Sequence, residues 1–137
     1  MKIFSEKINY GILAVFELAK SSYKGHIQIN DIAQAHSLKK NFLEKVLINL
    51  KRAGIVESIR GAQGGYKLLK APGDIKILDV IIALDGPVSI IDYSENPAVF
   101  QVFWKEKEVE FNELLSFTFE ELLNQEKILH DKLSFQI

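Results

Sequence analysis

Basic side chains and glycines gather in one stretch of the chain, between Lys39 and Lys70. Lysine and arginine donate hydrogen bonds to phosphate oxygens and base edges, and glycine lets a backbone approach a partner closely. These residue types suit the binding of a polyanion. The chain offers no Ser/His/Asp set, no paired carboxylates and no phosphate-binding loop between a strand and a helix, so we expect it not to be an enzyme.

A basic helix is expected to position the first part of this stretch. Apolar residues recur at helical spacing from Leu43 to Leu50, which predicts a helix over about 40–53 with lysines on its other side. Gly54 follows at the place of a left-handed helix cap. The basic residues just before this glycine suit a helix C-terminus.

A hairpin follows this helix and a short helix precedes it. Residues 55–59 and 66–69 are typical of strands, and the turn between them reads RGAQGG. A short helix capped by Asn30 is expected over 31–36. A leucine stripe opposite lysines is most often an ordinary solvated helix, but the glycine hairpin with Arg60 at its tip favours a winged helix-turn-helix.

The charge of the chain is divided between its two halves. Residues 1–70 hold 12 lysines and arginines against 5 acidic residues, a net +7, whereas residues 71–137 hold 5 against 13, a net −8. This division indicates a polyanion-binding module joined to a part with another role. Chance segregation of surface charge is the alternative. With no cysteine, signal peptide or membrane-spanning run, the simplest location is the cytoplasm.

The first helix is expected over 5–22, with Ser5 as its N-cap. Lys7 and Tyr10 lie near its start, where free backbone amides favour a phosphate. Packing of Tyr10 against the domain is an equally good interpretation of the same pattern.

A boundary is expected at Asp85-Gly86-Pro87, after a short apolar helix. It divides the chain into a binding domain, 1–87, and a region for dimerisation or sensing, 88–137. A long helix is expected over 97–115. A second helix is expected over 119–132, because Thr118 and Glu121 have the spacing of a capping box.

The long helix carries more apolar bulk than its own domain can easily cover. Its large residues are Phe100, Phe103, Trp104, Phe111, Leu114 and Leu115. Such a helix commonly packs against a symmetry mate, so we infer a homodimer. Packing back onto its own domain is the alternative.

The residues from 31 to 87 resemble a known family. The similarity is to the winged-helix core of the IscR/NsrR/CymR-type bacterial transcription regulators, the Rrf family, and it is carried by the run DIAQAHSLKKNFLEKVLINLKRAGIVESIRGAQGGYKLLKAPGDIKILDVIIALDGP. Within this run the elements typical of the family are LE, KRAGIV, RG, GGY and the closing GP. The resemblance implies a mainly α fold with a small β-hairpin wing: a winged helix-turn-helix domain plus a long C-terminal dimerisation helix.

The resemblance also implies a dimeric DNA-binding transcriptional regulator, expected here to be a repressor on a pseudo-palindromic operator. The residues implied at or near the major groove are Lys39, Lys40, Asn41, Phe42, Glu44 and Lys45. The wing residues implied at the minor groove or its phosphates are Arg60, Gly61, Gly64, Gly65 and Tyr66. Ser5, Lys7 and Tyr10 match the segment that contacts backbone phosphates in the family. Asn9 stands where relatives usually carry arginine, which departs from the family at one backbone contact.

Many relatives hold an iron–sulfur cluster through three cysteines that follow the Gly-Pro stop. Here the corresponding region, 88–105, has neither cysteine nor histidine, so thiolate ligation is impossible. Asp92 and Glu95 could hold a hard cation, but acidic loop residues are usually just solvated, and the three histidines of the chain have no ligand spacing. We therefore expect no metal and no cofactor, as in the cluster-free branch, where a partner protein, a small molecule or the protein level provides regulation.

Two other functions fit the same scaffold. The acidic, aromatic C-terminal half could serve a protein interaction instead of DNA binding, since fold does not fix function. A small-molecule sensor could have its pocket between the wing domain and the long helix, lined by Phe100, Phe103 and Trp104, although such aromatic residues are more often part of a core.

Overall fold

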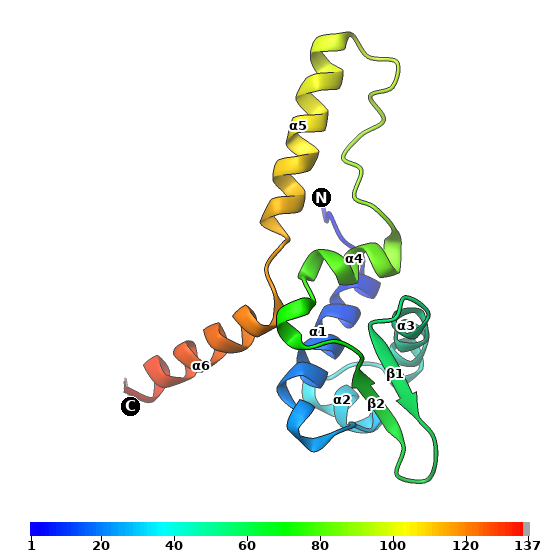
Figure 1. Ribbon diagram of the computed structural model, residues 1–137, viewed down its shortest axis with the longest axis vertical. Coiled ribbons are helices and arrows are strands. Elements are labelled where there is room, and N and C mark those ends of the chain that lie inside the picture. The colour runs from blue at the N-terminus through cyan, green and yellow to red at the C-terminus, as the bar shows by residue number, and fades with distance from the viewer. Residues whose placement is uncertain (136–137) are drawn as a thin grey trace.

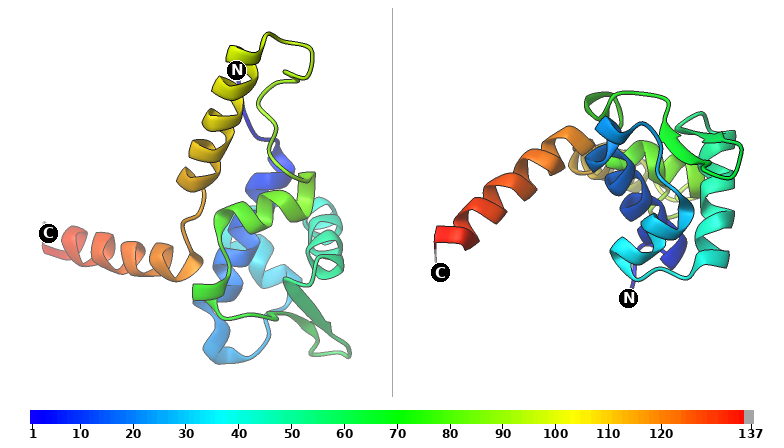
Figure 2. Two further views of the ribbon diagram at one scale, coloured as in Figure 1. Left: turned by 45° about the horizontal axis from the view of Figure 1, so that its top comes forward. Right: turned by 90° about the horizontal axis from the view of Figure 1, so that it is seen from below.

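Helices dominate the structure, and one antiparallel hairpin projects from them (Figure 1). The computed structural model describes residues 1–135. Its α-helices and strands in chain order are α1 (Glu6–Lys20), α2 (Ile29–His36), α3 (Lys40–Arg52), β1 (Val56–Ile59), β2 (Gly65–Leu68), α4 (Ile77–Asp85), α5 (Ala98–Leu114) and α6 (Phe119–Phe135). α1 to α4 form one body with the hairpin, and α5 and α6 leave it in different directions (Figures 1 and 2). The predicted fold class is confirmed.

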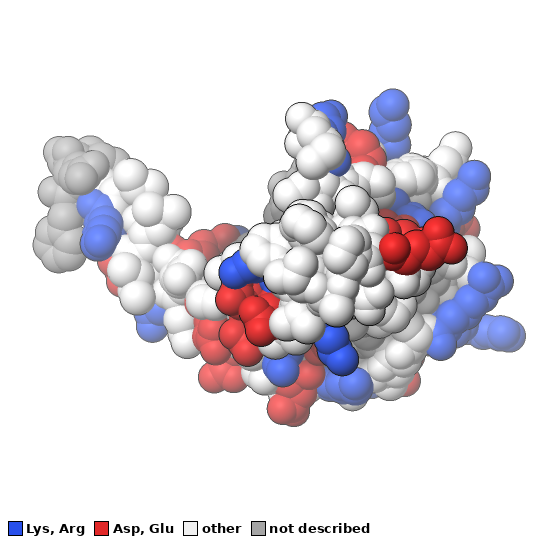
Figure 3. All heavy atoms as spheres, turned by 90° about the horizontal axis from the view of Figure 1, so that it is seen from above, with Lys and Arg blue, Asp and Glu red and all other residues white. Residues whose placement is uncertain are grey.

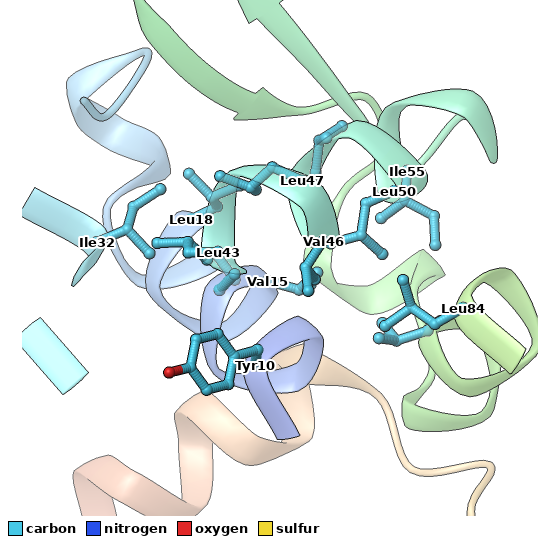
Figure 4. Packing of buried hydrophobic residues seen from close by; sticks show 14 of the residues in the cluster. Tyr10, Val15, Leu18, Ile32, Leu43, Val46, Leu47, Leu50, Ile55 and Leu84 are labelled. Atoms are coloured by element: carbon cyan, nitrogen blue, oxygen red, sulfur yellow. The ribbon is translucent and has the colours of Figure 1, made fainter. Parts of the chain in front are cut away.

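The core of the body lies between α1 and α3. The predicted apolar stripe of α3 is fully used, because Leu43, Leu47 and Leu50 are each 0% exposed. They belong to the same cluster as Val15 and Leu18 of α1 (Figure 4). Burying side chains of this size contributes roughly 1.5–3 kcal/mol each. The apolar residues whose spacing predicts α3 are therefore also the residues that pack it against α1.

Gly54 ends α3 as predicted. Its φ of 77° is left-handed, and its N–H donates to the carbonyl of Lys51 at 3.0 Å. The N–H of Ile55 donates to the carbonyl of Leu50, also at 3.0 Å. These two bonds satisfy carbonyls that a helix end leaves free, and they direct the chain into β1.

The start of α2 differs from the prediction. The helix begins at Ile29, with Gln28 as its N-cap, so Asn30 lies in the first turn and the expected cap at Asn30 is wrong. The reason lies just before the helix, where Ile27 forms an antiparallel bridge with Tyr66 of β2. Because the bridge fixes the path of the chain at residue 27, the helix starts at residue 29, two residues before the expected start at 31.

The C-terminal part of the chain returns to the body after α5. Phe119, at the start of α6, is 0% exposed, and its N–H donates to the carbonyl of Ile75 at 3.0 Å. Thr118 caps α6 as predicted, since its Oγ1 accepts from the N–H of Glu121 at 3.1 Å. α6 extends to Phe135, beyond the expected end at 132. Within residues 1–135, none of the helices is long and apolar enough to cross a membrane.

Candidate nucleic-acid interface

The start of α3 presents the largest group of predicted contact residues. Lys40, Asn41, Glu44 and Lys45 are exposed, and Phe42 is half-buried. One groove at this end of the helix is lined by Lys39, Lys40, Asn41, Phe42 and Lys45. Three ammonium groups around an apolar floor suit a phosphate backbone and the base edges beside it.

Tyr10 of α1 lies beneath this groove. Its side chain is 8% exposed, and its hydroxyl accepts a hydrogen bond from the backbone N–H of Lys39 at 3.0 Å. Its ring meets Phe42 edge-on, with the centroids 4.7 Å apart and the planes at 83°. Of the two interpretations of Tyr10, the structure matches packing against the domain. The hydroxyl fixes the residue from which α3 starts.

Replacing Tyr10 by phenylalanine is expected to loosen the start of α3. The variant keeps the ring but leaves the Lys39 N–H without its acceptor, so the free energy of unfolding should fall by about 0.5–1.5 kcal/mol. Urea unfolding followed by circular dichroism measures this change. Tyr23→Phe is the matched control, because Tyr23 is 81% exposed. Equal stability of the two variants would show that the Tyr10 hydroxyl does not hold α3.

The wing is a hairpin in which Ile59 pairs with Gly65 next to the turn. Arg60 opens the turn and is exposed. Gly61 has a φ of 115°, and its carbonyl accepts the N–H of Gly64 at 3.0 Å. A Cβ atom at Gly65 would collide with the carbonyl of Ile27. The glycines therefore make the tip compact and let β2 lie directly against the segment before α2.

Tyr66 of the wing lies within electrostatic range of Glu44 of α3. Tyr66 of β2 is half-buried, and burial raises the pKa of its hydroxyl. The negative charge of Glu44 raises the same pKa further. The carboxylate of Glu44 therefore lies near enough to the wing for its charge to act on the Tyr66 phenol.

Unlike Tyr10, the other two N-terminal residues of the predicted set, Ser5 and Lys7, make their contacts outside α3. Ser5 is the N-cap residue of α1, as predicted, but its side chain makes no capping hydrogen bond. The ammonium of Lys7 forms an ion pair with Asp85 of α4, with Nζ 2.7 Å from Oδ1. A phosphate that uses Lys7 must therefore compete with this carboxylate.

Charge on the folded surface is also uneven. Several lysine and arginine side chains project from the side of the body opposite α6 (Figure 3). On the other side, α6 begins with the acidic residues Glu120 and Glu121, and Glu126 pairs with Lys20 of α1 at 3.3 Å. The fold therefore keeps much of the basic charge apart from the acidic C-terminal half.

α5 is the second unusual surface, since none of its residues is buried. Phe100 is 50% exposed, Phe103 43% and Leu114 77%, while Trp104 and Phe111 are half-buried. The half-buried Leu115, just after α5, packs instead against the core of the body. The six predicted interface or pocket residues therefore comprise three exposed residues, two half-buried residues of α5 and one residue that packs on the core.

The loop before α5 is tied to that helix by polar contacts. The amide of Gln101 donates to the carbonyls of Ser94 and Asn96 at 3.1 and 2.8 Å. A hydrogen bond from the Tyr93 hydroxyl to Glu108 raises the pKa of Tyr93. Neither contact was predictable from spacing, because each depends on how the loop folds back along the helix.

Comparison with known proteins assigns the family. The model of the family Rrf2, described as iron-dependent transcriptional regulator, matches residues 4–125. The chain belongs to the Rrf2 family of transcriptional regulators. This membership confirms the resemblance seen between 31 and 87 and extends it through α5. It also confirms that the protein is a DNA-binding regulator and not an enzyme.

Individual relatives agree with this assignment. The regulator CymR of Bacillus subtilis is 38% identical over 124 residues, covering 89% of each chain. Its solved structure, described as that of the global cysteine regulator of B. subtilis, has a TM-score of 0.82 and covers 91% of this Rrf2-family chain and 98% of its own, at 35% identity. T. potens IscR has a TM-score of 0.77 at 33% identity, covering 91% of this chain and 88% of its own. An rrf2-like regulator of Rhodobacter capsulatus is 40% identical over 90 residues, which span 60% of that protein.

The residues of this Rrf2-family chain do not fit an iron centre. The chain has no cysteine, and within residues 1–135 no three histidine, aspartate or glutamate side chains are grouped closely enough to hold a metal. In the loop, the N–H and hydroxyl of Ser94 donate to Asp92 at 3.1 and 2.7 Å and hold the pKa of that carboxyl below its ordinary value. Asp92 is therefore hydrogen-bonded within its own loop, and neither Asp92 nor Glu95 belongs to a group of three possible metal ligands among the described residues.

Proposed function

We propose that this Rrf2-family regulator acts as a homodimeric repressor that works without an iron–sulfur cluster. The observation that carries the proposal is the combination of two surfaces on one chain: the basic start of α3 beside an arginine-tipped wing, and the uncovered apolar length of α5. The first suits a DNA half-site. The second suits packing against a symmetric copy of the chain, and the resulting dimer would present two such DNA-binding surfaces together.

The proposal assigns the major groove to α3 and the minor groove to the wing. The lysines of α3 would contact phosphates, Asn41 a base edge, and Glu44 the amino group of a cytosine. Arg60 would enter the minor groove, where its charge responds to groove width. Two copies would bind half-sites separated by one or more helical turns of DNA, each about 34 Å. A dimer seated over a promoter would block transcription there.

The site can be found by selecting bound fragments from a genomic DNA library with the purified protein. The proposal expects an inverted repeat among the fragments. In transcription in vitro from a promoter that carries this repeat, adding the protein should lower the transcript yield. Fragments without an inverted repeat, or a yield that rises, would contradict the dimeric repressor.

Single substitutions should show whether the proposed reading surface, formed by the start of α3 and the tip of the wing, contributes more to DNA binding than other basic residues do. Lys45→Ala and Arg60→Ala are each expected to weaken binding to the selected repeat by roughly tenfold and to reduce the slope of log affinity against log salt by about 1. Fluorescence anisotropy at several salt concentrations measures both quantities.

The matched control for these two variants is Lys127→Ala. Lys127 is an exposed cation on α6, away from α3 and the wing. Its removal should leave affinity and salt slope close to those of the unmodified protein. If Lys45→Ala and Arg60→Ala behave like this control, the reading surface lies elsewhere.

A further inference from the structure

The wing makes polar contacts that neither the fold class nor the reading surface requires. Its two strands have four residues each, and a two-stranded hairpin of this size is only marginally stable by itself. The strands carry Arg60 at a tip that lies at the far end of the hairpin from the core. Something must therefore hold the tip if Arg60 is to have a defined position.

The segment just before α2 supports the wing at the turn end of β2. Ile27 and Tyr66 exchange backbone hydrogen bonds of 2.9 and 2.8 Å, so residue 27 forms a one-residue antiparallel bridge beside β2. Gly65 allows the close approach, because a side chain there would meet the carbonyl of Ile27. The chain reaches this position through Gly25, whose φ is 87°.

The same segment also reaches the tip itself. Nε2 of His26 is within hydrogen-bond distance of the carbonyl of Gln63, inside the RGAQGG turn. The amide of Gln28 donates to Oε1 of the same Gln63, at 3.5 Å. The side chains on either side of Ile27 therefore converge on one residue of the turn, three positions after Arg60.

We propose that His26 is a positioning residue for DNA binding. Its hydrogen bond to Gln63, called the latch below, holds the tip of the wing and thereby fixes the position of Arg60 before DNA binds. This inference rests on the proposed function of the wing. The imidazole donates its Nε2–H to the Gln63 carbonyl, and Gln28 supports the side chain of the same residue. The latch reduces the number of tip conformations in the free protein, so the wing loses less conformational entropy when it enters the groove.

The first test measures the latch without DNA. In His26→Ala, hydrogen exchange at the Gly64 amide, which bonds to Gly61 inside the turn, should become roughly threefold to tenfold faster. Exchange at the Leu50 amide, in the core helix, should not change. His26→Gln should restore slow exchange, because the glutamine amide nitrogen can occupy the place of Nε2, whereas the shorter His26→Asn should not. Unchanged exchange at Gly64 in His26→Ala would overturn the latch.

The second test measures binding to the inverted repeat recovered by the genomic selection. His26→Ala should weaken binding roughly threefold to tenfold, and His26→Gln should bind like the unmodified protein. Combining His26→Ala with Arg60→Ala should cost less than the sum of the two single changes, since both act through one contact.

The outcomes of this second test distinguish the latch from the function on which it rests. Additive effects of the two changes would mean that His26 acts independently of Arg60, and they would overturn the latch while leaving DNA binding intact. Failure of the unmodified protein to bind any selected DNA would overturn both proposals. Weakened binding by Arg60→Ala together with unchanged binding by His26→Ala would overturn the latch alone.

Discussion

Phe103→Glu is expected to convert the protein into a monomer and to weaken its binding to an inverted repeat by about 100-fold or more. Phe103 lies near the middle of α5, which buries none of its own residues. If a second copy covers this helix, the new carboxylate would be buried without a partner, which costs several kcal/mol. The two half-sites would then be bound by separate molecules, without the gain from linkage. Light scattering after gel filtration and anisotropy titration measure the two effects.

Lys105→Glu is the matched control for this prediction. Lys105 is exposed on the same helix, and two residues correspond to about 200° around the helix axis. The control therefore introduces the same carboxylate on nearly the opposite side of α5, and it should remain a dimer. A Phe103→Glu variant that is still dimeric at micromolar concentration would remove α5 from the proposed interface.

Phe119→Ala is expected to destabilise the fold by about 3–5 kcal/mol, the largest single effect on stability that we predict. Phe119 is 0% exposed, and it is the residue at which α6 joins the core of the body. Its removal leaves a cavity between α6 and the segment around Ile75. The midpoint of urea unfolding should shift accordingly, with little change in slope.

Tyr23→Ala provides the comparison for an aromatic residue outside the core. Tyr23 is 81% exposed, so truncating it should change the free energy of unfolding by less than about 0.5 kcal/mol. If Phe119→Ala unfolds at the same urea concentration as Tyr23→Ala, α6 is not anchored through this side chain.

The parts of the fold that follow from local sequence were predictable. The stripe from Leu43 to Leu50 and the cap at Gly54 both depend on residues within one or two helical turns, and both have the predicted positions. Thr118 likewise caps α6 with a partner three residues away. In each case the physical cause lies inside the segment that shows the pattern.

The details that depend on distant residues were not predictable. Asn30 looked like a helix cap, but the bridge between Ile27 and Tyr66 starts α2 earlier. Phe119 was visible as the start of a helix but not as a core residue, because its neighbours lie more than forty positions away at Ile75.

The candidate site shows the same division. The basic residues of α3 could be identified by type and spacing, and the structure places them around one groove. The pairing of Lys7 with Asp85 and the contact of His26 with Gln63 join segments far apart in the chain. No pattern of composition marks such pairs, because isolated lysine and histidine residues occur on most surfaces.

α1 has a consequence for how an outside signal could reach DNA. It is a single uninterrupted helix of 15 residues, and it packs against α2, α3, α4, α6 and β2. Near one end Lys20 is paired with α6, and in the other half the Tyr10 hydroxyl contacts the residue that starts α3. α1 therefore contacts both the C-terminal helix and the residue at which the basic groove begins. If α3 enters the major groove as proposed, a ligand or protein bound at α6 would act on a helix that also contacts the start of α3.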